Sequence, residues 1–133
     1  LIELLVVIAI IGILSSVVLA SLNSARAKGQ DATIKSNLNN LRAQAALYYD
    51  NNNNYGAATS TDTTACATQL FADPTIASMI SSVKGAGNPT LSCVASANNF
   101  VISAALKSGG NWCVDYLGAA ATSTANLTGG KCN

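Results

Sequence analysis

The sequence contains no histidine, and Glu3 is its only glutamate. Catalytic triads, Cys–His pairs and His-ligated zinc sites need an imidazole, and most general acid–base catalysis by carboxylates needs a suitable pair of acids. Only 10% of the residues are charged, and the formal net charge is +1, so the clustered basic stripe typical of nucleic-acid-binding proteins is missing. We therefore expect neither an enzyme nor a nucleic-acid partner, and we expect no metal and no cofactor.

The low charge reflects an apolar N-terminal segment. Residues 1–20 are all Ala, Val, Ile or Leu apart from Glu3, one glycine and two serines, and no charged residue lies between Glu3 and Arg26. As a helix, this uncharged stretch would be about 33 Å long, which matches the bilayer's hydrocarbon core of roughly 30 Å. A helix that is apolar on all sides must be buried in lipid or in other protein.

Three interpretations of this segment compete. A secretory signal peptide begins with basic residues and ends at a small-residue cleavage site, whereas this segment begins with an acid and continues into a further helical pattern. A plain membrane anchor fits the length but not the acid. The third interpretation is a helix that leaves the membrane to form the core of a helical protein assembly, which the all-round apolar surface suits equally well.

Glu3 decides between the last two interpretations. At the level of the lipid headgroups it would be a charge favoured by the helix dipole. Packed among copies of the same helix, it would pair with a cation, and the nearest one is the α-amino group of a neighbouring subunit. In apolar surroundings, losing one member of such a pair leaves the other uncompensated. We expect this second role.

An acid near the start of an apolar run that continues into Ile-Gly-Ile-Leu is a specific pattern. It closely resembles the N-terminal segment of type IV pilins and of the related pseudopilins of type II secretion. The resemblance implies that Glu3 pairs with a neighbour's terminal amine during assembly. It also implies that the filament core is formed by Leu1, Ile2, Leu4, Leu5, Val6, Val7, Ile8, Ile10, Ile11, Gly12, Ile13 and Leu14.

The same resemblance implies processing and assembly partners. In this family a prepilin peptidase removes a leader, the new N-terminus is N-methylated, and an assembly machinery with an ATPase builds the filament. Family members usually carry a Phe and one further residue ahead of the position that matches Leu1.

The helical pattern continues past the apolar segment. One face of an amphipathic helix is formed by residues at steps of four and three, namely Ile34, Leu38, Leu41, Ala45 and Tyr48. An asparagine-rich run at residues 51–54 should end the helix. We therefore expect one helix that reaches about residue 50, divided between a hydrophobic segment at residues 1–25 and a globular head at residues 26–133.

The rest of the head is expected to hold a short helix and a small sheet. Residues 55–92 should form a connecting region, with a polar surface run at 59–64 and a helix opened by Asp73 and Pro74. Strand patterns lie at residues 91–95, 100–107 and 112–117, the last two joined by a hairpin turn, and the tail from residue 118 should be an exposed loop. The predicted fold class is α+β: a long N-terminal helix packed against a small antiparallel sheet in a disulfide-stapled head.

Four cysteines are widely spaced and include no C-x-x-C pair. Structural zinc sites usually show close ligand pairs, whereas an even number of cysteines on an exported domain is typical of two disulfides. Three connectivities are open. We favour Cys66–Cys93 and Cys113–Cys132, because pairing sequence neighbours needs the simplest topology. Many pilins close a C-terminal loop with a disulfide, and Cys113–Cys132 resembles that arrangement.

The apolar helix and the resemblance together imply a structural subunit, a major pilin that polymerises with copies of itself. It would be held in the bacterial inner membrane before assembly and would then join a filament on the cell surface. Adhesion, twitching motility, DNA uptake and secretion share this subunit design. One alternative is a pseudopilin, but the calcium-binding carboxylates that would favour it are represented in the C-terminal part only by Asp115. Another is a monomeric membrane-anchored binding module, in which Glu3 would be dispensable.

Overall fold

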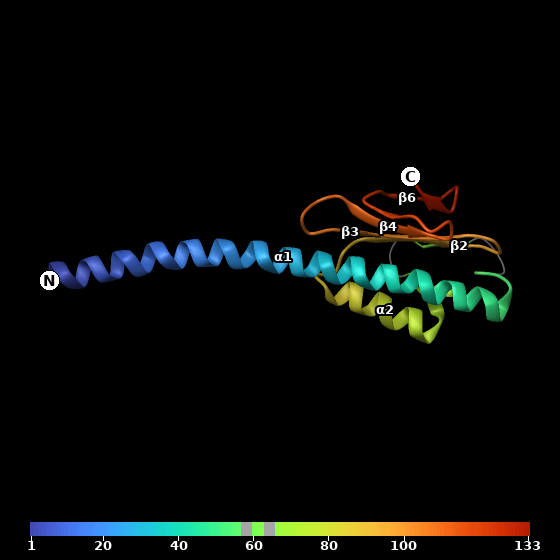
Figure 1. The fold of residues 1–133 in the computed structure, drawn as a ribbon, viewed down its shortest axis with the longest axis horizontal. Coiled ribbons are helices and arrows are strands. Elements are labelled where there is room, and N and C mark those ends of the chain that lie inside the picture. Colours follow the sequence, from blue (N-terminus) through green and yellow to red (C-terminus); the bar gives the residue numbers. More distant parts are fainter. Residues whose placement is uncertain (57–59, 63–65) are drawn as a thin grey trace.

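The computed structural model describes residues 1–56, 60–62 and 66–133, and for residues 60–62 it describes the backbone (Figure 1). It has the predicted α+β fold, with a long helix, a short helix and an antiparallel sheet. The elements in chain order are α1 (Ile2–Asn52), β1 (Ser60–Asp62), the 3₁₀ helix η1 (Gln69–Ala72), α2 (Pro74–Gly85), β2 (Leu91–Ala95), β3 (Phe100–Ala105), β4 (Asn111–Asp115), β5 (Ala120–Ala121), β6 (Ala125–Asn126) and β7 (Lys131–Cys132).

Helix α1 determines the shape of the molecule. Its N-terminal half projects from the head as a free rod, and its C-terminal half lies beside the sheet and α2 (Figure 1). The helix ends at Asn53, which adopts a left-handed conformation with φ of 56° and donates its backbone N–H to Tyr49 O. Asparagine tolerates this conformation better than most residues, so the expected end of the helix in the asparagine-rich run is confirmed.

The main sheet is antiparallel, with the strand order β1-β2-β3-β4-β5. The three predicted strands form its centre, and the turn between β3 and β4 is the predicted hairpin. Strand β1 was not predicted; it lies in the expected connecting region and pairs with β2 through Ser60 opposite Ala95. A polar segment of this length carries no hydrophobic alternation, so only its backbone pairing reveals it as a strand. The expected surface exposure of residues 59–64 concerns side chains outside the described part of the chain.

The core lies where α1, α2 and the inner face of the sheet meet. Ile34, Leu38, Leu41 and Ala45 of the predicted helical face are fully buried, while Tyr48 at the end of that face is only partly buried. The other large core side chains come from η1, α2 and the strands, and they include Leu70, Phe71, Ile76, Ile80, Val83, Phe100, Ile102 and Val114. The amphipathic half of α1 is therefore the central element of the head.

Helix α2 begins as the sequence predicted. Asp73 caps it, because its Oδ1 accepts hydrogen bonds from the backbone N–H groups of Thr75 (3.0 Å) and Ile76 (3.3 Å). Pro74 occupies the first helical turn, where a missing N–H costs nothing. The cap fixes the point at which the chain turns back along α1.

The C-terminal tail differs from the expected exposed loop. Strands β6 and β7 form a hairpin over the outer face of the main sheet (Figure 1). Below it, Val94, Val101 and Cys113 are buried, and the tail covers them with Ala125, Leu127 and Cys132. The prediction failed because a tail rich in small polar residues carries little periodic signal. The apolar outer face of the sheet nevertheless needs cover.

Both expected disulfides are present in the structure. Cys66–Cys93 joins the segment before η1 to β2, and Cys113–Cys132 joins β4 to β7. Asp115 reinforces the second connection, since its side chain is buried and its Oδ2 accepts a hydrogen bond from the backbone N–H of Cys132 at 2.9 Å. The tail is therefore tied to the sheet by a covalent bond and by a charge-assisted hydrogen bond.

A second buried acid, Asp31, was not anticipated from the sequence. Its side chain is 5% exposed, and its two carboxylate oxygens accept hydrogen bonds from the backbone N–H groups of Lys107 (2.6 Å) and Ser108 (3.0 Å). Burial by itself raises the pKa of Asp31, but the hydrogen bonds from Ser108 and Lys107 and the charge of Lys35 outweigh it and lower the pKa. Asp31 thus links the point where α1 enters the head to the β3–β4 turn.

We predict that Asp31→Ala lowers the free energy of unfolding by about 1.5–3 kcal/mol, the usual value of hydrogen bonds to a charged group. Because the folded state lowers the pKa of Asp31, the stabilisation is fully present above the unfolded pKa. It is lost as the pH falls through the folded pKa. Urea unfolding of the detergent-solubilised chain at neutral and acidic pH should therefore show a difference between wild type and variant that shrinks in acid. Equal stabilities at neutral pH would contradict this role.

We predict that the double substitution Cys113→Ser and Cys132→Ser costs about 3 kcal/mol, since it removes a cross-link that constrains the unfolded chain. It should also speed amide hydrogen exchange in residues 118–133, because β7 loses its covalent tie to β4. The matched control is Cys66→Ser with Cys93→Ser, which should leave exchange in the tail unchanged. Equally slow tail exchange in both variants would show that the second disulfide does not hold the hairpin.

Candidate assembly site

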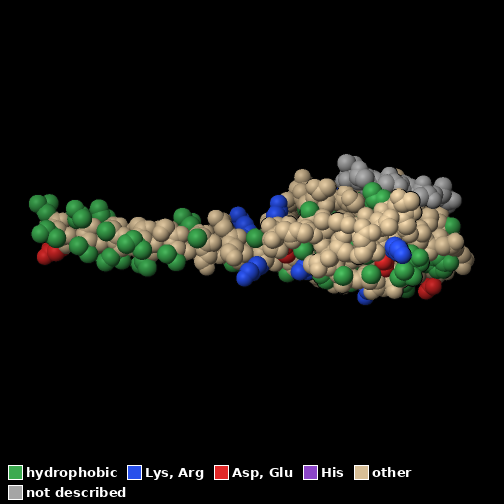
Figure 2. All heavy atoms as spheres, turned by 90° about the horizontal axis from the view of Figure 1, so that it is seen from above, with side chains coloured by type: hydrophobic (Ala, Val, Ile, Leu, Met, Phe, Trp, Pro, Cys, Tyr) green, Lys and Arg blue, Asp and Glu red, His purple; other side chains and the backbone are tan. Residues whose placement is uncertain are grey.

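The free half of α1 exposes apolar side chains along its length, as the face drawn in Figure 2 shows. Every residue from 1 to 26 is exposed, and the first fully packed position along α1 is Asp31. The large apolar side chains of this half are each at least 48% exposed; they are Leu1, Ile2, Leu4, Leu5, Val6, Val7, Ile8, Ile10, Ile11, Ile13, Leu14, Val17, Val18, Leu19 and Leu22. We call residues 1–25 the rod.

The rod is too apolar to remain in water. Continuous exposed apolar surface of this extent marks a site of contact with protein or membrane. Among the described residues, α1 is the one helix long and apolar enough to cross a membrane, and none of its apolar window is buried within the subunit. By length and composition, the rod is a candidate membrane anchor.

Glu3 is the only charged side chain on the rod, and it lies in the first turn of α1. The next charged residue along the chain is Arg26, about 35 Å further along the helix axis at 1.5 Å per residue. The basic side chains of the head are therefore far from the Glu3 carboxylate. A cation for this acid must come from a chain terminus or from another molecule.

Two further features fit a rod that is enclosed by other helices. Nothing lies within 4 Å of a Cβ placed on Gly12, so the subunit's own packing gives no reason for a glycine that costs about 1 kcal/mol in a helix interior. Small residues allow helices to approach closely. The hydroxyl of Ser16 donates to Ile13 O at 2.7 Å, so it needs no water when the rod is buried.

The structure thus places the predicted site residues on one surface. Glu3 and its apolar neighbours from Leu1 to Leu14 share the exposed end of the rod, whereas both disulfides lie in the head. A single chain would contain one half of each expected contact, because the expected partner surface is that of a second copy. The hydrogen-bonding roles of Asp31 and Asp115 were not predicted, since neither residue has a local pattern that reports its distant backbone donors.

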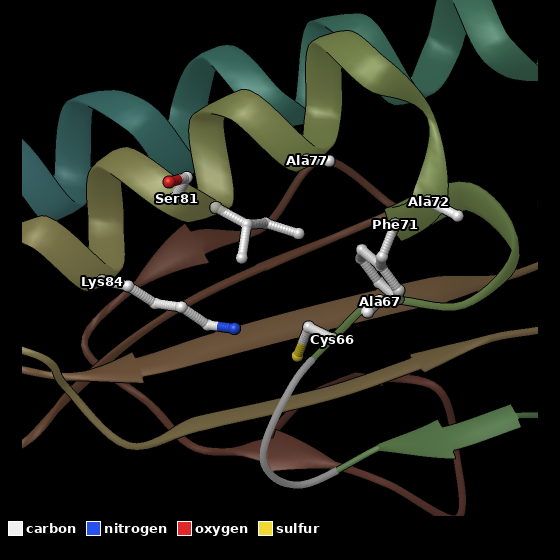
Figure 3. A pocket seen from close by; sticks show the side chains of 8 residues that line it. Cys66, Ala67, Phe71, Ala72, Ala77, Ser81 and Lys84 are labelled. Carbon is white, nitrogen blue, oxygen red and sulfur yellow. The ribbon is translucent and has the colours of Figure 1, made fainter.

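The head contains a surface pocket of about 370 Å³ between α2 and the segment that leads into η1 (Figure 3). Its walls are mostly apolar, with Lys84 extending from α2 and Phe71 facing it; the lining residues are Cys66, Ala67, Phe71, Ala72, Ala77, Ile80, Ser81 and Lys84. Cys66 is bonded to Cys93 and is no thiolate nucleophile.

The described residues include no group of three or more His, Cys, Asp or Glu side chains placed to hold a metal ion. Asp115, the acid that a calcium site in the C-terminal part would need, uses its Oδ1 to accept backbone N–H groups of Leu117 and Ala119, both at 3.0 Å. Its Oδ2 accepts the backbone N–H of Cys132, so both oxygens of this carboxylate hold the backbone of the tail.

Comparison with protein-family models, curated proteins and solved structures finds no match to this chain. Function is therefore inferred from the residues and their geometry.

We predict that a chain lacking residues 1–25 folds and is monomeric in detergent-free buffer, because the rod contributes no buried residue to the head. Its thermal unfolding midpoint should equal that of the head in the full chain, and sedimentation should give the mass of one subunit. The full chain should require detergent or should associate. A truncated chain that still forms large assemblies would show that the head, and not the rod, drives association.

Proposed function

We propose that this protein is a structural subunit of the type IV pilin kind, which polymerises through its rod into a helical filament on the cell surface. The observation that carries the proposal is the rod itself: a helix apolar on all sides, unburied within the subunit, with one acid in its first turn. The disulfide-stapled head would form the outer wall of the filament. The protein would perform no bond chemistry.

The energetics divide assembly into two stages. Removing the rod from water is strongly favourable, at about 25 cal/mol for each Å² of apolar surface. Moving it from lipid into a bundle of sister rods gains far less, because lipid is as apolar as leucine. The inner membrane would therefore hold the subunit first. Extraction would need the external work that an assembly ATPase supplies, after a prepilin peptidase has processed the chain.

Glu3 would provide the specificity that apolar contacts lack. Apolar rods can slide past one another at little cost, whereas an ion pair in apolar surroundings fixes one register, as single buried polar residues do in coiled coils. Pairing of the Glu3 carboxylate with a neighbour's terminal amine would align each incoming rod. Repetition of this head-to-tail contact without closure gives a fibre and not a ring.

We predict that Glu3→Ala leaves the subunit in the membrane fraction but reduces filaments by about tenfold or more, since breaking one member of a pair in an apolar environment costs about 3–5 kcal/mol. Filaments sheared from cells would be counted by electron microscopy, and membrane-held subunit would be measured by immunoblot. Asp50→Ala is the matched control, because Asp50 is an exposed acid on α1 within the head.

Normal filaments from the Glu3→Ala variant would contradict the pairing role. Absence of filaments from wild type and variant alike, with the subunit dispersed singly in the membrane, would instead favour a monomeric membrane-anchored binding module.

A further inference from the structure

Basic side chains gather where the rod enters the head (Figure 2). Arg26 and Lys28 lie on α1 directly after the uncharged stretch, and Lys107 lies on the β3–β4 turn. All three side chains are exposed. We call Arg26, Lys28 and Lys107 the basic collar.

The collar surrounds α1 where the rod enters the head, a region that we call the neck. Two helical residues that are two positions apart point about 200° from each other, so Arg26 and Lys28 lie on opposite sides of α1. The hydrogen bond from Lys107 N to Asp31 Oδ1 places the third residue level with Asp31, about 8 Å further along the axis than Arg26. Its side chain runs past Gly87 beside Gln30. The three cations therefore form a narrow ring around the neck.

Among the described residues, Asp31 is the one acid side chain at this level. The carboxylate of Asp31 is buried and accepts two backbone N–H groups, so it turns toward the protein. Asp50 and Asp73 lie at the opposite end of the head, near the end of α1 and the start of α2. Glu3 is about 35 Å away along the rod. The neck consequently presents positive charge directly beside an apolar cylinder.

The position of the collar matches the headgroup layer of a bilayer. If residues 4–25 cross the hydrocarbon core, Arg26 lies at its boundary. The collar then occupies the next 8 Å or so, where each leaflet has about 5–8 Å of polar headgroups. Guanidinium and ammonium groups form strong charge-assisted hydrogen bonds with phosphate oxygens.

We propose that the basic collar binds the headgroups of anionic phospholipids in the leaflet that faces the head. This inference rests on the membrane-held stage of the proposed function and names the surface that the subunit engages there. The bound lipids would set the depth of the rod, and assembly would have to release them. The positive-inside rule does not explain the collar, because that rule places basic residues on the cytoplasmic flank of a membrane-spanning helix. The collar lies on the flank that carries the head, and a disulfide-bonded head belongs to an oxidising compartment.

The competing partner is the acidic surface of a neighbouring head in the filament. Among the described side chains, the far end of the head offers little to match three cations. Asp50 is exposed there, but Asp73 already uses its Oδ1 to cap α2. An anionic lipid surface supplies many phosphates at the depth where the uncharged stretch ends, so it fits the collar better.

The test reconstitutes the full chain in phosphatidylcholine vesicles that contain traces of spin-labelled phosphatidylglycerol or spin-labelled phosphatidylcholine. Electron paramagnetic resonance then measures the fraction of each label that the protein restricts. The wild-type chain should prefer phosphatidylglycerol by about fivefold or more, because one basic residue near an anionic surface is worth about fivefold in affinity. Salt should weaken this preference.

Two triple variants test whether the collar is responsible. Replacing Arg26, Lys28 and Lys107 by Gln should abolish the preference for phosphatidylglycerol. The matched control, Arg26→Lys with Lys28→Arg and Lys107→Arg, keeps the charges and should keep the preference. Circular dichroism and urea unfolding establish that both variants have the wild-type fold.

Equal restriction of both lipids by the wild-type chain would overturn the proposal, as would an undiminished preference in the Gln variant. If the wild-type chain shows no lipid preference and the Gln variant fails to form filaments, the collar binds a neighbouring head instead. Glu3→Ala should retain the full preference for phosphatidylglycerol, because Glu3 lies at the other end of the rod. Failure of the polymerisation proposal is thereby distinguished from failure of this one.

Discussion

The exposed apolar surface of the rod is the physical constraint on which the proposed function of this structure depends. One continuous helix carries two different surfaces, since residues 1–25 are apolar on all sides while Ile34, Leu38, Leu41 and Ala45 form a single stripe. The side chains of this stripe are buried within the subunit against α2 and the sheet. The apolar surface of the rod is not buried within the subunit, so the head has a complete core while the rod still needs apolar surroundings. A helix that is apolar on all sides is buried in lipid or in other protein, and the protein surroundings that we propose are sister rods.

The neck joins these two halves. Asp31 attaches α1 to the β3–β4 turn through two backbone N–H groups, so the direction of the rod is fixed relative to the sheet. The same turn carries Lys107, whose exposed side chain lies with those of Arg26 and Lys28 around the neck. One short region therefore sets the orientation of the rod and presents positive charge, which fits the membrane-held stage that we propose.

The sequence was informative wherever the signal was local and periodic. The length of α1, its buried stripe, the Asp73 cap and the central strands all follow from spacing within a few residues, and both disulfides follow from the simplest pairing. Features held by distant backbone groups could not be predicted. Asp31 and Asp115 accept N–H groups from residues far along the chain, and the covering hairpin β6–β7 is built from small polar residues without alternation. In the candidate assembly site, the rod was predictable because its uncharged apolar run is visible in the sequence. The pairing role of Glu3 stays a prediction.

The most direct test of the central claim asks what surrounds the rod in cells. A photo-cross-linking amino acid at Ile8, whose side chain is exposed in the middle of the rod, would be activated in intact cells, and the products in sheared filaments would be resolved by mass spectrometry. The account predicts cross-links from position 8 to the rods of other copies of this chain. Cross-links to lipid alone, with every subunit recovered as a monomer, would contradict it.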